Sequence, residues 1–176
     1  MEQTKYDVFI SYSRRDYVDD LGNVLPDNML SKIMELFSAN GISYWLDEEG
    51  IYSGDEFASI LTKAIRNSSL FLFVSSANSN QSKWTSNEIS TALEFKKTII
   101  PFRLDDSQYN DSVMMKIVSF DYIECRNQEK ALLKLLKAVN YHLKRPSHGI
   151  ASKANGVAEN GAEAKRKENS YVAEEA

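Results

Sequence analysis

Hydrophobic residues in this chain gather in two kinds of segment that follow one another along the sequence. Short, nearly continuous runs rich in aromatic and β-branched residues predict strands over residues 6–12, 42–46, 70–74, 98–102 and 120–123. Longer stretches with apolar residues three and four positions apart predict helices over residues 26–40, 56–67, 83–96 and 128–143. Strands that alternate with helices predict a parallel sheet flanked by helices, which is a doubly wound α/β fold.

Several residues within these segments refine the prediction. The run from Leu70 to Val74 is apolar throughout, as expected of a strand that is covered on both faces. Pro101 lacks an amide donor, so the fourth strand should be short or lie near an edge. Pro26 suits the first turn of its helix, and Asn40-Gly41 marks the end of that helix.

The character of the sequence changes after Arg145-Pro146. From there to Ala176 the residues are mainly Ala, Gly, Asn, Lys and Glu, with few bulky apolar side chains. Such a segment buries too little surface to offset the entropy of ordering. We therefore predict a domain over residues 1–145 and a linker or disordered tail over residues 146–176.

The composition narrows the function classes. A formal net charge of −4 and a pI of about 5.3 argue against a general binder of nucleic acid or of anionic membranes. Cys125 is the single cysteine, so an intrachain disulfide and a cysteine zinc site are excluded, and we expect its thiol to be buried and inert. His142 and His148 lie near the end of the readable pattern, which disfavours a histidine triad or metal cluster in the body. A carboxylate is the expected catalytic group.

No segment predicts secretion or membrane insertion. The first residues are followed by no apolar run of the signal-peptide type. The longest strongly apolar run is Leu70 to Val74, whereas a membrane span needs about twenty residues. We expect a soluble, cytoplasmic protein.

Three polar clusters follow predicted strands or begin helices, where α/β sheets bind ligands. In the turn from Ser11 to Asp16, hydroxyls and the Arg14 guanidinium can hold a pyrophosphate or a ribose. An ordinary polar turn explains the same residues, and without further information it is the better explanation. The loop from Asp47 to Asp55 contains two glycines that allow positive φ, and a solvated loop explains it equally well.

The third cluster is Trp84-Thr85-Ser86-Asn87-Glu88. Residues four apart share a helix face, so the Trp84 ring and the Glu88 carboxylate project together. An indole face suits a flat cationic ring, and a carboxylate can bind ribose hydroxyls and stabilise positive charge at an anomeric carbon. The residues alone favour a simpler interpretation, in which Trp84 packs and Glu88 lies on a solvated face.

Taken together in order, these segments resemble a TIR (Toll and interleukin receptor homology) domain. Tyr6 to Tyr12 resembles the opening box of the family, and Trp45-Leu46-Asp47 with the following Ile51, Ser53-Gly54 and Phe57 resembles the second strand and the BB loop. Trp84 to Ile89, followed by Ala92-Leu93 and Ile99 to Pro101, resembles the segment that carries the glutamate of the NAD-cleaving members. The resemblance covers about residues 5–143.

The resemblance implies a flavodoxin-like fold with five strands and a set of roles. Glu88 would be the catalytic carboxylate, and Trp84 would shape its surroundings. The residues that would line the nucleotide site are Ser11, Tyr12, Arg14 and Asp47, while Ile51 and Gly54 would belong to a gating loop. NAD⁺ would be the substrate rather than a cofactor, with no metal required. The products would be nicotinamide and either ADP-ribose or a cyclic isomer, a signal in bacterial immunity.

Two alternatives remain open at this point. Many TIR domains act as assembly modules, so a non-enzymatic adaptor that binds other TIR domains is the main alternative. A nucleoside deoxyribosyltransferase-like enzyme shares this topology and a glutamate, but it should act on deoxynucleosides. A response-regulator receiver is excluded because its paired acids and later lysine are not evident.

Overall fold

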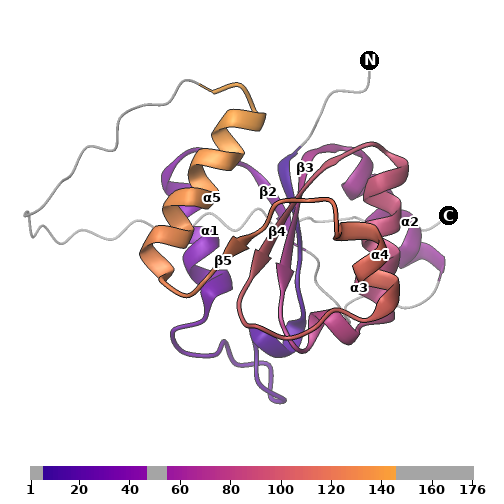
Figure 1. Cartoon of the computed structure of the whole chain (residues 1–176), viewed down its shortest axis with the longest axis horizontal. Helices are drawn as coiled ribbons and strands as arrows, with labels where there is room; N and C mark the ends of the chain where they lie inside the picture. The colour runs from indigo at the N-terminus through magenta and orange to yellow at the C-terminus, as the bar shows by residue number, and fades with distance from the viewer. Residues whose placement is uncertain (1–5, 47–54, 146–176) are drawn as a thin grey trace, which may run out of the picture.

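Five parallel strands form the centre of the computed structural model, which describes residues 6–46 and 55–145 (Figure 1). The strands are β1 (Tyr6–Ser11), β2 (Tyr44–Leu46), β3 (Ser68–Ser75), β4 (Thr98–Arg103) and β5 (Ile123–Glu124), and they lie in the order β2-β1-β3-β4-β5. The helices are α1 (Met29–Ala39), α2 (Asp55–Arg66), α3 (Lys83–Glu94), α4 (Asp111–Ile117) and α5 (Gln128–His142). The predicted flavodoxin-like α/β fold is confirmed.

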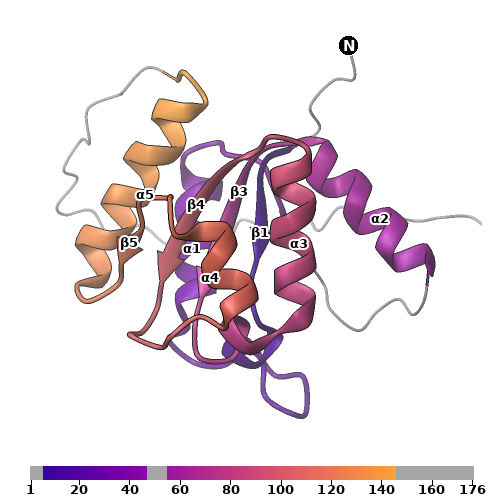
Figure 2. The same ribbon diagram turned by 45° about the vertical axis from the view of Figure 1, so that its right-hand side comes forward.

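Helices cover both faces of this sheet (Figures 1 and 2). On one face, Val8 and Ile10 of β1 belong to a core cluster with residues of α1 and α5, such as Phe37 and Leu135. On the other face, Phe9 belongs to a second cluster with residues of α2, α3 and α4. Successive residues of a strand point to opposite faces, so each residue of β1 is assigned to one of these two layers.

The central strand β3 is buried on both faces, as its apolar run predicts. Residues 70–74 are all buried, with exposed fractions between 0% and 3%. β3 pairs with β1 from Ser68 to Phe73 and with β4 from Leu70 to Ser75. The Phe9 ring of β1 stacks on Phe71, with 5.2 Å between the ring centroids.

β4 continues through Pro101 to Arg103 and is the second strand from the edge. Pro101 pairs with Phe73 of β3, whereas the pairing of β4 with β5 begins at Phe102. Pro101, which has no amide hydrogen to donate, therefore lies at a position where β4 pairs with β3 but not with β5. This agrees with the predicted position near an edge, although the strand runs past the proline.

The start of α1 differs from the prediction that Pro26 occupies its first turn. The helix begins at Met29, and the N-cap is Asn28, whose side chain accepts a hydrogen bond from the Ser31 amide at 2.8 Å. Asp27 has a φ of 54°, which breaks the helical path between Pro26 and the cap. A local capping interaction thus determines the start of the helix.

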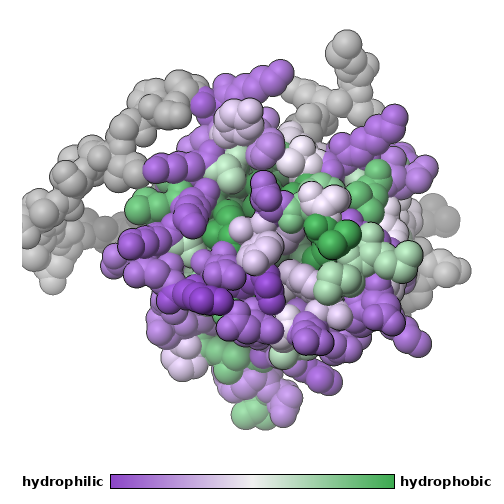
Figure 3. Space-filling view, in the orientation of Figure 1, coloured by the Kyte–Doolittle hydropathy of each residue, from purple (hydrophilic) through white to green (hydrophobic). Residues whose placement is uncertain are grey.

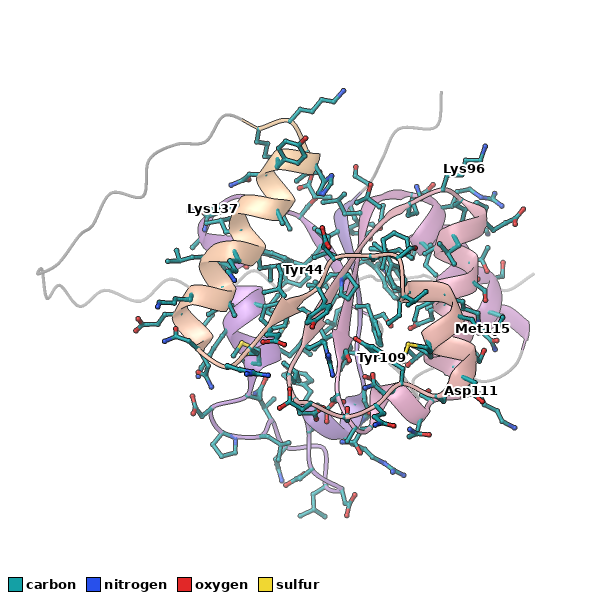
Figure 4. The ribbon with its side chains drawn as sticks, viewed as in Figure 1. Tyr44, Lys96, Tyr109, Asp111, Met115 and Lys137 are labelled. Atoms are coloured by element: carbon teal, nitrogen blue, oxygen red, sulfur yellow. The ribbon has the colours of Figure 1, made fainter. Side chains whose placement is uncertain are left out.

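The sequence pattern predicts no helix where α4 lies. This helix buries Val113 and Ile117, but Met115 and the residue after the helix, Val118, are 82% and 73% exposed. Apolar residues on both sides hide the helical periodicity of such a short segment. Figure 4 labels Met115 on this helix, and Figure 3 shows hydrophobic side chains at the surface over the same region.

A contact between distant parts of the chain fixes the end of α5. Arg145 pairs with Asp7 at 2.8 Å and donates a hydrogen bond to the carbonyl of Gly41 at 3.0 Å. These partners lie at the amino ends of β1 and β2, opposite the edge at which the strands end. The predicted tail, residues 146–176, lies outside the described residues. Among the helices that are described, none is long and apolar enough to cross a membrane.

Candidate active site

Glu88 and Ser11 meet at the carboxyl end of β1, although they are 77 residues apart in sequence. Ser11 is the last residue of β1 and is fully buried, and its hydroxyl donates a hydrogen bond to Glu88 Oε2. Glu88 lies in the second turn of α3 and is 1% exposed. The interpretation of Glu88 as part of a solvated helix face is therefore wrong.

The position of Glu88 follows from how α3 begins. Ser82 is the N-cap, and its side chain accepts a hydrogen bond from the Thr85 amide at 3.3 Å. The helix then turns Thr85, Glu88, Ile89 and Ala92 toward the sheet, where all four are buried. Glu88 thus occupies a core-facing position that an apolar residue would ordinarily fill.

Trp84 lies one turn before Glu88 and is partly buried. It packs against the cluster that contains Phe9 and Ile89. The expectation that Trp84 packs is confirmed. Its additional role beside a substrate ring stays a prediction.

Two other predicted substrate contacts are Tyr12 and Arg14, which follow Ser11 in the chain. Tyr12 is 5% exposed and belongs to the cluster on the opposite face of the sheet from Phe9. Its ring lies edge-on to Tyr17, with 6.0 Å between centroids. Arg14 lies in a short 3-10 helix, Arg14–Asp16, and is exposed. The structure thus places Ser11 beside Glu88, whereas Tyr12 belongs to the other layer.

Asp47, Ile51 and Gly54 lie outside the described residues. Their predicted roles as a nucleotide contact and a gating loop stay predictions.

Short polar side chains form a hydrogen-bond network within the loop between β3 and α3, residues 76–82. Within it, the Ser76 amide donates to Ser79 Oγ at 2.8 Å, and the Ser79 amide donates to Ser76 Oγ at 3.1 Å. Ser75 Oγ donates to Asn80 Oδ1 at 2.8 Å. All four side chains are buried, so the loop at the start of α3 is held by internal hydrogen bonds.

The segment after β4 adds an acidic and an aromatic group to this edge. Burial alone would raise the pKa of Asp105, but hydrogen bonds from Ser107 and the Ala77 amide, together with the Arg103 charge, bring that pKa below its ordinary value of 3.8. The Arg103 guanidinium lies over two rings, 5.4 Å from the centroid of Tyr109 and 5.1 Å from that of Tyr122. Tyr109, labelled in Figure 4, also contacts Phe73, with 6.2 Å between centroids.

Cys125 directly follows β5 and lines a small pocket with Arg103 and Arg126. It is half-buried, and burial raises the pKa of its thiol, opposed by the charge of Lys32. A thiol with a raised pKa is a poor nucleophile at neutral pH, which agrees with the expected inertness. Within residues 6–46 and 55–145, no group of three or more His, Cys, Asp or Glu side chains is placed to hold a metal ion.

The order of these segments matches a known family. The family model of the TIR domain matches residues 8–136, which are most of the chain. The chain belongs to the TIR domain family. The resemblance inferred from the sequence is thereby confirmed.

Solved structures support the fold. The TIR domain of the Toll-related receptor TRR-2 from Hydra magnipapillata has a TM-score of 0.59 and 17% identity, over 77% of this chain and 99% of that chain. The RPS4 and RRS1 TIR domain heterodimer gives a TM-score of 0.55 and 14% identity, over 77% and 96%. The CMP N-glycosidase BcmB from Clostridium botulinum gives a TM-score of 0.50 and 18% identity, over 73% and 97%. No curated protein sequence matches this chain.

Proposed function

We propose that this TIR domain cleaves NAD⁺ between nicotinamide and ribose, with Glu88 as the catalytic carboxylate. The observation that carries the proposal is the burial of Glu88 at the carboxyl edge of the sheet, where Ser11 donates to its Oε2. Removing a carboxylate from water is costly. Such a cost at a ligand-binding edge is typical of a functional group.

The proposed reaction breaks the bond between the anomeric carbon and the nicotinamide nitrogen. Nicotinamide leaves with the electron pair, and positive charge develops on the ribose as an oxocarbenium-like transition state. The negative charge of Glu88 stabilises that cation and binds ribose hydroxyls. Water then attacks the anomeric carbon and releases a proton to solvent, which gives ADP-ribose. Attack by another nucleophile of the same ADP-ribose gives a cyclic isomer.

Two further observations support this proposal. Trp84 lies one turn from Glu88, a spacing that carries the resemblance to the NAD-cleaving members, and its indole suits a pyridinium ring. The fold is also similar to that of an enzyme named for cleaving an N-glycosidic bond of a nucleotide, the CMP N-glycosidase. That chemistry, like the proposed one, separates a nitrogen base from a ribose.

The direct test is product analysis after incubation of the purified chain with NAD⁺. Glu88→Gln keeps the volume of the side chain and removes its charge, so we expect a loss of at least about 10²-fold in cleavage, the scale of one preorganised electrostatic group. Glu94→Gln is the matched control, because Glu94 is an exposed carboxylate on the same helix. Full activity in the Glu88→Gln variant would refute the mechanism.

We further propose that activity rises when copies of the domain associate. Glu88 is 1% exposed, so NAD⁺ reaches it only after a rearrangement. Association that favours the open state would increase its population. The solved TIR domain heterodimer supports such a contact between domains of this family.

The test is specific activity as a function of protein concentration. We expect a rising curve for the wild type and a flat, low curve for Gly54→Pro, since proline fixes φ near −65° in the proposed gating loop. A flat wild-type curve together with a fully active Gly54→Pro variant would contradict this.

A non-enzymatic adaptor is the second candidate function. The observation that favours it is the exposed apolar surface at the end of α4, where Met115 and the following Val118 are 82% and 73% exposed. An adaptor would associate through such a surface and leave NAD⁺ unchanged at any protein concentration.

A further inference from the structure

Carboxylates from two neighbouring segments hold the loop between β3 and α3. On the β1 side, Asp16 accepts hydrogen bonds from Ser76 Oγ and from Asn78 Nδ2, the latter at 2.6 Å. On the β4 side, Asp105 accepts a hydrogen bond from the Ala77 amide at 3.0 Å. The strand order places β1 and β4 on either side of β3. Ser76 and Asn78 are therefore bound by Asp16 on the β1 side, and Ala77, which lies between them in sequence, is bound by Asp105 on the β4 side.

Asp16 connects the same two segments that meet in the contact between Ser11 and Glu88. Ser11 and Asp16 both belong to the β1 segment, five positions apart. The loop that Asp16 holds leads directly into α3, which carries Glu88. Because α3 follows this loop directly, a shift of the loop would move the start of the helix and with it the Glu88 carboxylate.

We propose that Asp16 is a positioning residue for NAD⁺ cleavage, which holds α3 so that Glu88 stays in register with Ser11. This inference rests on the proposed function. Productive geometry at a catalytic site tolerates a displacement of only about 0.5 Å. A misplacement of about 1 Å costs about 10²-fold in rate.

Asp16 accepts two hydrogen bonds, and a carboxylate is a stronger acceptor for them than an amide. Its two oxygens accept from both donors, and hydrogen bonds to a charged acceptor are about twice as strong as neutral ones. In Asp16→Asn the charge is lost, and the NH₂ group that replaces one oxygen can keep the contact with Ser76 Oγ only if this hydroxyl reverses from donor to acceptor. Asp16→Glu keeps both acceptors on a side chain that is longer by one methylene group.

The kinetic test compares kcat and KM for NAD⁺ in three variants. We expect Asp16→Asn to lower kcat by about tenfold to a hundredfold, the range for a displacement of up to about 1 Å, with KM unchanged. Asp16→Glu should recover part of kcat. Asp20→Asn is the matched control, because Asp20 is an exposed carboxylate in the same segment, and it should behave like the wild type.

A second measurement does not depend on activity. In a Trp45→Phe background, Trp84 is the remaining tryptophan and reports on the start of α3. We expect Asp16→Asn to increase acrylamide quenching of Trp84 fluorescence and Asp20→Asn to leave it unchanged. All measurements are made below the onset of thermal unfolding of each variant.

The outcomes separate this inference from the proposed function. A wild-type chain that leaves NAD⁺ intact refutes the proposed function, and Trp84 quenching still tests whether Asp16 holds α3. Unchanged quenching in Asp16→Asn overturns the inference. A wild-type kcat in that variant also overturns it, and so does a rise in KM at constant kcat, which would make Asp16 a substrate contact.

Discussion

Replacing Ser11 by alanine removes the hydroxyl that donates to Glu88 and tests the buried pair directly. A hydrogen bond to a charged group contributes about 1.5–3 kcal/mol to stability, whereas a neutral one contributes about 0.5–1.5 kcal/mol. Both side chains are at most 1% exposed, so water does not readily replace the lost donor. We expect Ser11→Ala to lower the free energy of unfolding by about 1.5–3 kcal/mol. In a chain of this size, that lowers Tm by about 3–12 °C.

A double-mutant cycle isolates the contribution of the carboxylate. In a Glu88→Gln background the bond becomes neutral, and Ser11→Ala should cost only about 0.5–1.5 kcal/mol. The matched control is Ser68→Ala, because Ser68 is also fully buried and its hydroxyl donates to a neutral acceptor, the Ala64 carbonyl, at 2.8 Å. The assay is urea unfolding followed by circular dichroism. Equal costs of Ser11→Ala in the two backgrounds, within about 0.5 kcal/mol, would refute an interaction with the charge.

Two more predictions concern stability. The pKa of Asp105 lies below its ordinary value of 3.8 in the folded chain, so its contribution is complete above that pH and is lost as the pH falls through the folded pKa. Asp105→Asn should therefore flatten the acid limb of a plot of Tm against pH, and an unchanged acid limb would contradict this. Truncation after Arg145 should leave Tm nearly unchanged, whereas truncation after Lys144 should lower it, because the salt bridge from Arg145 to Asp7 is lost. Equal melting curves for the two truncations would show that this salt bridge contributes nothing.

The order and type of most elements could be predicted from the sequence because each has a local signal. The run from Leu70 to Val74 is apolar enough to indicate a strand buried on both faces, and β3 is that strand. α4 has no comparable signal, since its buried side chains are Val113 and Ile117 alone among several apolar residues. Burial of a short helix is decided by the elements that it packs against.

The candidate site could be predicted only in part, because burial depends on elements that are distant in sequence. Helical spacing indicates that Trp84 and Glu88 share a face, but it does not say whether that face meets solvent or core. The burial of Glu88 depends on Ser11, which is distant in sequence and whose orientation follows from strand alternation. The hydrogen bonds of Asp16 could not be predicted either, because its partners, Ser76 and Asn78, follow a different strand.

The salt bridge between Arg145 and Asp7 has a consequence for how the domain can be used. It brings the two ends of the described body together at the amino ends of the strands, whereas Glu88 lies at their carboxyl ends. Domains whose ends are adjacent tolerate insertion and circular permutation. A module joined at either end of this body is therefore attached at the amino edge of the sheet, opposite the edge that carries Glu88.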